Sequence, residues 1–371
     1  MSETVSADQF DSLFRHDAPL LDVRAPVEFA QGAFATATNL PLLTDSERQQ
    51  VGLTYRQAGR AAAVKLGHEL VTETTRETRL QGWQAFAASN PDALLYCYRG
   101  GLRSQFVQQW LQEAGVNIAR IEGGYKALRR HLIRVVEQFD AQDRLVLVAG
   151  KTGSGKTHFI NSLDIGVDLE KLANHRGSAF GKHVEPQPSQ ANFENALGIA
   201  LLKCLAIEPR RIAVEDESHA IGSISVPKKF HLAMGQAPIA VIEENLDARV
   251  QTIHMDYIQS NYQAFKVQHP DPDAAETLFT EFLLGALTRI KKRLGGERYQ
   301  HLNTLMLEAL RQQFQNRSTV AHETWIRELL QQYYDPMYDY QLGKKADRIV
   351  FRGSKAEVKA WIQPMLRTGD S

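Results

Sequence analysis

The sequence predicts an α/β protein with two parallel-sheet domains, the second of which carries a C-terminal helical portion. From Leu20 to about Arg134, short apolar runs alternate with helix-like stretches, as is typical of an open α/β domain. A second strand-loop-helix series begins at Arg144, and its apolar runs favour buried parallel strands. The length of 371 residues also exceeds the size that one hydrophobic core usually serves.

The elements of the two domains follow in chain order. Strands are predicted over residues 20–23, 93–96 and 117–121 in the first series, and over 144–149, 211–214 and 238–242 in the second. The polar stretch Glu137 to Asp143 is the best boundary, so the domains are placed at 1–137 and 138–371. A helical segment covers about 272–340: apolar residues fall at three- and four-residue spacing from Leu278 to Leu294, as in an amphipathic helix. Gly295 and Gly296 should stop that helix before helices over 302–314 and 322–334 and a strand over 348–351.

The composition is that of a compact globular protein in the cytoplasm. Apolar residues make up 43% and charged residues 23%, which are ordinary values. No run approaches the roughly 20 apolar residues that span a bilayer, and Met1 to Asp11 lacks the pattern of a signal peptide. We therefore expect no membrane association. Cys97 and Cys204 are the two cysteines, and in a reducing compartment each is expected to be a free thiol.

Cys97 lies at the predicted end of the strand over 93–96. It is followed by Tyr98-Arg99-Gly100-Gly101-Leu102-Arg103-Ser104 and a helical stretch over 105–114. Backbone N–H groups of such a turn, with the positive end of the helix, form a cradle for an anion. A lone cysteine after a strand is more often a small core residue, but the glycines and arginines favour a nucleophilic thiolate. Cys97, Arg99 and Arg103 are therefore the expected catalytic residues.

The second domain opens with a phosphate-loop pattern. The segment from Gly150 to Thr157 matches G-x-x-x-x-G-K-[ST] directly after an apolar strand, which is the context that the motif requires. Its glycines let backbone N–H groups approach phosphate oxygens, Lys156 adds a charge and Thr157 can ligate Mg²⁺. The expected phosphate contacts come from Gly150, Gly153, Ser154, Gly155, Lys156 and Thr157.

Further candidates for this site are polar residues in two later segments. Glu215, Asp216 and Glu217 follow the strand over 211–214. An acid at this position would approach the same phosphates; the alternative is that the three side chains are simply solvated at a strand end. Asp216 is the first choice, also as a partner of Thr157 for Mg²⁺, although the sequence does not decide among the three. His175 and Arg176 are candidates for phosphate or base contact, in a segment that could equally be an ordinary surface connection. Cys204 lies in an apolar helical stretch and is expected to be core.

A short basic cluster is the best candidate for RNA contact. The chain has 43 basic and 43 acidic residues and zero net charge, so any RNA-binding surface must be local. The residues from Arg289 to Arg293, with Arg298, form the densest positive cluster. The alternative is the solvated end of a helix, where cations suit the dipole. The predicted RNA contacts are Lys291, Lys292, Arg293 and Arg298.

The first domain resembles a rhodanese domain over roughly residues 10 to 135. The resemblance is carried by Leu21 to Arg24, Glu28-Phe29, Gly32, the Cys97 loop and Glu122-Gly-Gly-Tyr125. The loop spacing is Cys-x5-Arg rather than the Cys-x4-Arg of many single-domain sulfurtransferases, which favours a larger or phosphate-bearing donor. That spacing also occurs in cysteine phosphatases, but these commonly carry a His where this chain has Tyr96.

The joined halves, with the segment His175-Arg-Gly-Ser-Ala-Phe-Gly181, resemble the tRNA 2-selenouridine synthase family over essentially the whole chain. The resemblance implies a transferase that geranylates 2-thiouridine at the tRNA wobble position with geranyl diphosphate. It then implies replacement of the geranylthio group by selenium from selenophosphate, with a selenophosphate-supplying enzyme as a possible partner. No tightly bound cofactor is expected, and a role for Mg²⁺ is left open. Two alternatives are a P-loop ATPase or kinase with a regulatory rhodanese or cysteine-phosphatase-like domain, and a non-enzymatic sulfur- or RNA-binding module.

Overall fold

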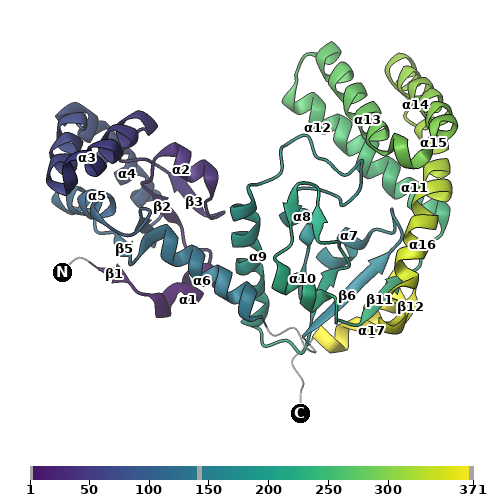
Figure 1. The fold of residues 1–371 in the computed structure, drawn as a ribbon, viewed down its shortest axis with the longest axis horizontal. Coiled ribbons are helices and arrows are strands. Elements are labelled where there is room, and N and C mark those ends of the chain that lie inside the picture. Colours follow the sequence, from purple (N-terminus) through teal and green to yellow (C-terminus); the bar gives the residue numbers. More distant parts are fainter. Residues whose placement is uncertain (1–2, 140–143, 367–371) are drawn as a thin grey trace. The chain divides into compact units, whose positions relative to one another are not determined.

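The computed structural model describes residues 3–139 and 144–366, and the chain divides into two compact units. The first unit comprises residues 1–139 and 189–206, and the second comprises 140–188 and 207–371. Each unit is built around a parallel β-sheet with helices (Figure 1). The predicted fold class is therefore confirmed. The end of the expected boundary stretch, from residue 140 to residue 143, lies outside the described residues.

The sheet of the first unit is five-stranded and parallel, with the order β1-β5-β4-β2-β3. Alternate residues of a strand face opposite sides of a sheet: Leu20 and Tyr96 enter one apolar cluster, while Leu21 and Leu95 enter another. The sheet is thus buried on both faces, as parallel sheets usually are. Its strands confirm the three that were predicted and add two, and they are β1 (Thr4–Val5), β2 (Leu20–Asp22), β3 (Ala37–Asn39), β4 (Leu94–Tyr96) and β5 (Ala119–Ile121).

The helices of the first unit include a long pair between β3 and β4. The first of them, α3 (Asp45–Leu70), begins with a capping box in which Thr44 and Glu47 satisfy each other's backbone N–H groups. Gly59, with φ of 81°, breaks it into two helical stretches. The others are η1 (Ala7–Gln9), α1 (Phe10–Arg15), α2 (Pro26–Gln31), α4 (Glu73–Ser89), α5 (Leu102–Glu113), α6 (Gly124–Gln138) and α9 (Gln190–Leu205).

Helix α9 belongs to the first unit although it follows the phosphate loop in sequence. It packs beside α6, as Figure 1 shows, and a Cβ on Gly198 would lie 2.9 Å from Leu132 Cβ. Cys204 is buried on this helix and belongs to the core, as predicted. The apolar pattern of α9 indicates a buried helix, but it does not indicate which of the two units that helix belongs to.

The sheet of the second unit is also five-stranded and parallel, with the order β12-β11-β6-β8-β7. The four predicted strands of this region are confirmed as β6, β8, β11 and β12. The central strand β6 is buried throughout its length. The strands are β6 (Leu145–Gly150), β7 (Gly166–Val167), β8 (Ile212–Glu215), β11 (Ile239–Ile242) and β12 (Ile349–Gly353), with a separate antiparallel pair of β9 (Ala220–Ile221) and β10 (Ile224–Ser225).

The predicted helical portion packs around its own core, which includes Phe279, Leu283 and Met306. Gly295, with φ of 81°, ends α13 where predicted, and the next helix starts at Gly296. The helices of this unit are α7 (Lys156–Asn161), α8 (Leu169–Leu172), α10 (Lys228–Met234), α11 (Leu246–Ile253), π-helical η2 (His254–Gln259), α12 (Ser260–Gln268), α13 (Pro272–Leu294), α14 (Gly296–Asn316), α15 (His322–Leu329), π-helical η3 (Leu330–Tyr334), α16 (Asp335–Gly343), η4 (Ala346–Arg348) and α17 (Lys355–Leu366).

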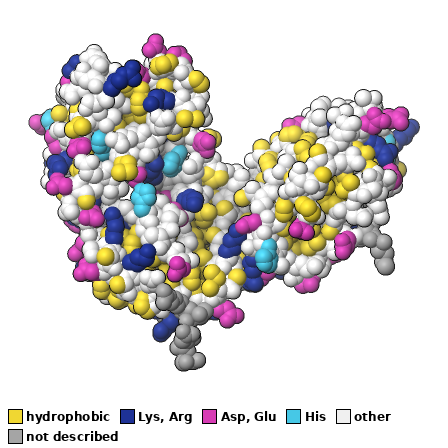
Figure 2. All heavy atoms as spheres, turned by 180° about the vertical axis from the view of Figure 1, so that it is seen from behind, with side chains coloured by type: hydrophobic (Ala, Val, Ile, Leu, Met, Phe, Trp, Pro, Cys, Tyr) yellow, Lys and Arg dark blue, Asp and Glu magenta, His cyan; other side chains and the backbone are white. Residues whose placement is uncertain are grey.

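The surface carries both signs of charge. On the face shown in Figure 2, Lys and Arg side chains are interspersed with Asp and Glu side chains. Within residues 3–139 and 144–366, no helix has both the length and the apolar character needed to cross a membrane.

Candidate functional site

Cys97 lies where the first sheet reverses its strand order. The chain runs from β2 to β3 on one side and from β4 to β5 on the other, and ligands of open parallel sheets bind at the carboxyl ends of strands at such a point. Cys97 directly follows β4 and is 3% exposed. Its Sγ lies 3.2 Å from Ser104 Oγ in the first turn of α5. The thiol therefore faces the N-terminal end of a helix, as predicted.

Glycines allow the cysteine loop to pack closely against the start of α6. Gly100 has φ of 63°, and a Cβ there would lie 2.8 Å from Ile121 O. A Cβ on Gly124 would overlap Cys97 O, while Tyr125 N donates a 2.9 Å hydrogen bond to that same oxygen. The Glu122-Gly-Gly-Tyr125 segment thus holds the loop from behind.

The front of the loop offers backbone donors. In the part of the chain that the structure describes, the N–H groups from Tyr98 to Gly101 donate no backbone hydrogen bond. Consecutive N–H groups in a turn of this kind bind anions, and the helix that begins at Leu102 adds its positive end. The loop is therefore suited to hold a small anion beside the Cys97 thiol.

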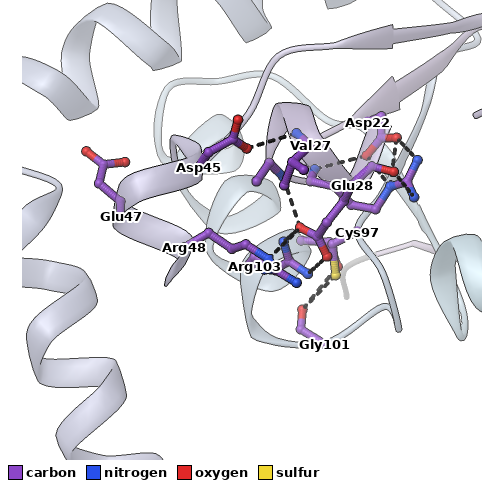
Figure 3. Close-up of polar contacts among 12 residues, drawn as sticks. Asp22, Val27, Glu28, Asp45, Glu47, Arg48, Cys97, Gly101 and Arg103 are labelled. Carbon is purple, nitrogen blue, oxygen red and sulfur yellow. Dashed lines mark hydrogen bonds and ion pairs between the residues drawn. The ribbon is translucent and has the colours of Figure 1, made fainter. Parts of the chain in front are cut away.

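The two loop arginines have different environments. Arg103 forms an ion pair with Glu28 at 2.5 Å, and Glu28 also lies 3.6 Å from Arg48 of α3 (Figure 3). Burial works against ionisation of Glu28, but the Arg103 guanidinium outweighs it and lowers the pKa of Glu28. Arg99 is exposed and lies over the Tyr98 ring at 5.9 Å. Arg103 therefore fixes the loop, while Arg99 is free to meet a ligand from solvent.

A buried ion pair supports this arrangement. Arg24 Nη2 lies 2.6 Å from Asp22 Oδ2, and both side chains are almost fully buried. The same guanidinium donates to Glu28 O at 3.2 Å and to Gly32 O at 2.7 Å. Breaking such a pair leaves an uncompensated charge in the interior, which costs about 3–5 kcal/mol. Asp22 and Arg24 thus orient the segment that carries Glu28, and Glu28 in turn holds Arg103.

The phosphate loop has the backbone that its motif requires. Gly153 and Gly155 have φ of 82° and 74°, a region that glycine adopts without strain. A Cβ on Gly153 would lie 2.7 Å from Arg249 O. The loop lines a pocket of about 580 Å³, and Lys156 Nζ donates to Gly150 O at 2.9 Å. Of the predicted phosphate-contact residues, the pocket is lined by Gly150, Gly153, Gly155, Lys156, Thr157, Arg176 and Asp216.

The acids of this pocket are arranged differently from one another. Asp216 forms an ion pair with Lys345 at 2.7 Å. Thr157 donates a 2.9 Å hydrogen bond to Glu170, whose N–H donates to Glu215 Oε2 at 3.1 Å. Burial raises the pKa of Glu170 and, by more, that of Glu215. Glu170 and Glu215 therefore lie beside Thr157, and no motif marked Glu170, which reaches Glu215 across 45 residues of chain.

Glu217 is the acid with the clearest pH signature. Burial, followed by the charge of Glu170, raises its pKa to about 8, whereas an unperturbed Glu has a pKa of about 4.3. Between these values the folded protein binds more protons than the unfolded chain, so the free energy of unfolding falls as pH rises. We predict that the free energy of unfolding falls less for Glu217→Gln than for wild type as the pH rises from 5 to 8.

The midpoint of urea unfolding at the two pH values measures this effect. Glu243→Gln, an exposed position of the same unit, is the matched control and should follow the wild-type pH dependence. Equal pH dependence of Glu217→Gln and wild type would contradict the raised pKa.

His175 and Arg176 do not share one environment. His175 is 4% exposed, accepts a 3.1 Å hydrogen bond from Gly177 N, and is not among the described residues that line the pocket. Arg176 lines the pocket, donates to Asn261 at 3.1 Å and lies over the Tyr257 ring at 5.0 Å. His183 also lines it, and burial lowers its pKa to about 4. The structure thus shows His183 and Tyr257 at this site, which the sequence pattern did not indicate.

The basic cluster lies at the end of α13 and in α14. Lys291, Lys292, Arg293 and Arg298 are exposed, and Lys291 lies 4.8 Å from the centre of the Tyr299 ring. Arg293 also lines the phosphate-loop pocket. The cluster therefore extends from the rim of that pocket onto the surface of the helical portion.

Known protein families match both parts of the chain. Residues 6–131 match the rhodanese-like domain model, and residues 143–368 match the model described as tRNA 2-selenouridine synthase AAA domain. A tRNA 2-selenouridine synthase of Shewanella denitrificans is 46% identical, covering 98% of this chain and 99% of the relative. Proteins of the same name from Photobacterium profundum and Azotobacter vinelandii are 47% and 49% identical, covering 96% and 95% of this chain and 98% and 96% of the relatives.

These matches extend over both units and nearly the full length of each relative, and they include the segments that hold the cysteine loop and the phosphate loop. The chain therefore belongs to the tRNA 2-selenouridine synthase family.

Proposed function

We propose that this chain is a transferase that converts 2-thiouridine at the tRNA wobble position to 2-selenouridine in two steps. The observation that carries the proposal is that one chain holds a thiol in an anion-binding loop and a separate phosphate-loop pocket. Its relatives are named tRNA 2-selenouridine synthase. The reaction would take place in the cytoplasm, with selenophosphate supplied by a partner enzyme.

The first step is assigned to the phosphate-loop pocket. The thiouridine sulfur attacks C1 of the geranyl group, the bond from C1 to oxygen breaks, and diphosphate leaves while the base loses its N3 proton. Lys156 and the loop N–H groups stabilise the charge that develops on the departing diphosphate. The same pocket is also lined by Tyr257, Met337 and Tyr338, whose rings and thioether can contact the geranyl chain.

The acids beside Thr157 fit a Mg²⁺ ion that accompanies a diphosphate. In the described part of the chain, no three His, Cys, Asp or Glu side chains converge as a metal site, but Mg²⁺ at phosphates usually takes one or two protein ligands and keeps several waters. Glu215 Oε1 is buried and has no hydrogen-bond partner among the described residues. Thr157 and Glu170 would hold the ion, and its charge would neutralise the diphosphate. Asp216 fits this role less well because Lys345 already neutralises it.

The second step is assigned to the cysteine loop. Selenium of selenophosphate bonds to C2 of the base, the bond from C2 to sulfur breaks, and geranylthiol leaves; water then cleaves the bond between phosphorus and selenium and releases phosphate. Alkylation makes this exchange feasible, because a thiolate leaves more readily than a sulfide dianion. The loop N–H groups and Arg99 would hold the donor anion beside Cys97.

The direct test supplies the purified chain with 2-thiouridine tRNA, geranyl diphosphate and selenophosphate, and identifies the nucleosides by mass. Formation of 2-selenouridine through a geranylated intermediate is expected. ATP turnover that depends on Lys156 and is indifferent to tRNA, with no change in the nucleosides, would instead indicate an ATPase. Loss of 2-selenouridine from tRNA in cells that lack the protein is the matching result in vivo.

The basic cluster at the end of α13 is expected to contact tRNA phosphates. Lys291→Glu combined with Lys292→Glu should weaken tRNA binding and reduce the salt slope of binding by about 2, because each phosphate contact contributes about 1. The titration is repeated at several salt concentrations. Lys228→Glu with Lys229→Glu makes the same charge change on exposed positions of α10 and should have a smaller effect. Equal losses in the two pairs would mean that the cluster is an ordinary solvated helix end.

A further inference from the structure

The cavity that the cysteine loop lines extends well beyond the loop, and most of its wall does not suit a small anion. Its volume is about 520 Å³, within the range of small-molecule pockets. Most of its wall is aliphatic or aromatic, from Leu42, Leu43, Val51, Val64, Phe106 and Trp110. Selenophosphate needs N–H groups and guanidinium groups, which the loop supplies, and it would gain nothing from such a wall.

The cysteine sulfur and this wall belong to one apolar cluster. Cys97, Leu42, Leu43 and Trp110 are all buried in it, with exposures of 3%, 5%, 6% and 8%. Helix α3 supplies a further part of the wall through Val51 and Val64. The cavity is therefore a preformed apolar chamber with a thiol in its wall.

The rim has a different chemistry from the chamber. Among the lining residues, Tyr55 and Tyr98 are 59% and 39% exposed, and Arg60 and Arg99 are also exposed. Exposed aromatic rings stack on unpaired bases, and arginines contact the RNA backbone. The rim is thus suited to a single-stranded nucleotide, while the chamber is suited to an apolar substituent on that nucleotide.

We propose that this cavity binds the geranyl chain of S-geranyl-2-thiouridine tRNA during selenium exchange. The inference rests on the proposed function, because that reaction places a branched ten-carbon chain on the base whose C2 must reach the donor anion at the cysteine loop. Burial of the chain anchors the modified base with C2 near Cys97. Binding of a non-reacting part of a substrate can be used to orient the reacting part. The geranyl group therefore contributes to substrate recognition, in addition to converting the sulfur into a leaving group.

The test compares two substrates in the exchange step alone: 2-thiouridine tRNA alkylated on sulfur with a geranyl group or with a methyl group, each given selenophosphate. The full-length wild-type chain should convert the geranyl substrate with a kcat/KM on the order of 100-fold higher, since the longer chain buries many more methylene-sized groups. The ratio of the two kcat/KM values is the readout.

Val64→Phe should lower that ratio at least about tenfold, because the ring occupies the chamber. Val64→Thr, which keeps the shape but adds a hydroxyl, should lower it by a smaller factor and serves if the larger variant does not fold. Ala61→Phe adds the same ring to an exposed position of α3 that is not among the described lining residues, and it should keep the wild-type ratio.

A wild-type ratio near one, or Val64 variants that keep the wild-type ratio, overturns the inference. Failure of wild type to produce 2-selenouridine from either substrate overturns the proposed function, and the assignment of the cavity with it.

Discussion

Cys97→Ser is expected to stall the reaction at the geranylated nucleoside. Serine preserves the shape of the loop, including the neighbour Ser104 at 3.2 Å, but its hydroxyl does not ionise near neutral pH. The exchange step should therefore slow by at least about 100-fold, because it loses an ionisable group that can give its proton to the departing geranylthiolate. Alkylation needs the tRNA sulfur and the phosphate loop, so S-geranyl-2-thiouridine should accumulate in a reaction that contains both donors.

Cys204→Ser is the matched control for this prediction. Burial raises the pKa of the Cys204 thiol to about 11, so that thiol stays protonated. Cys204 lies on α9 and is not among the described residues that line the cavity at the cysteine loop. This variant should yield 2-selenouridine at the wild-type rate. Normal yield from Cys97→Ser would remove Cys97 from the mechanism, and loss of geranylation as well would mean that the two steps are not chemically separable.

Lys156→Ala is expected to block the geranylation step. Removal of the ammonium group takes away the principal positive charge of the loop, and a diphosphate leaving group would depart without that partner. Loss of one preorganised donor of this kind typically costs about 100-fold or more in rate. Formation of S-geranyl-2-thiouridine from 2-thiouridine tRNA and geranyl diphosphate measures the effect.

Lys151→Ala provides a control in the same loop. Lys151 is paired with Asp339 at 2.9 Å and is not among the described residues that line the pocket, so its loss should change the rate by less than about tenfold. When tRNA that already carries S-geranyl-2-thiouridine is supplied, Lys156→Ala should still exchange selenium. Unchanged geranylation by Lys156→Ala would remove the phosphate loop from this step.

The sequence by itself determined the features that depend on contiguous residues. The strand-loop-helix order of both sheets, the phosphate loop from Gly150 to Thr157 and the cysteine at a strand end are all properties of short segments. Apolar spacing and glycine positions report such local structure directly. For the same reason the end of α13 at Gly295 was predictable.

Tertiary structure alone decided which distant residues complete each site. Glu28 reaches Arg103 across 75 positions, and Lys345 neutralises Asp216 across 129. The apolar chamber beside Cys97 exists because α3 supplies part of its wall, and α9 packs against α1 and α6 of the first unit although it follows the phosphate loop. Hydrophobic periodicity states that a face is buried but not against which partner. The partner depends on the path of the chain through space, and that path is set by packing between elements far apart in sequence.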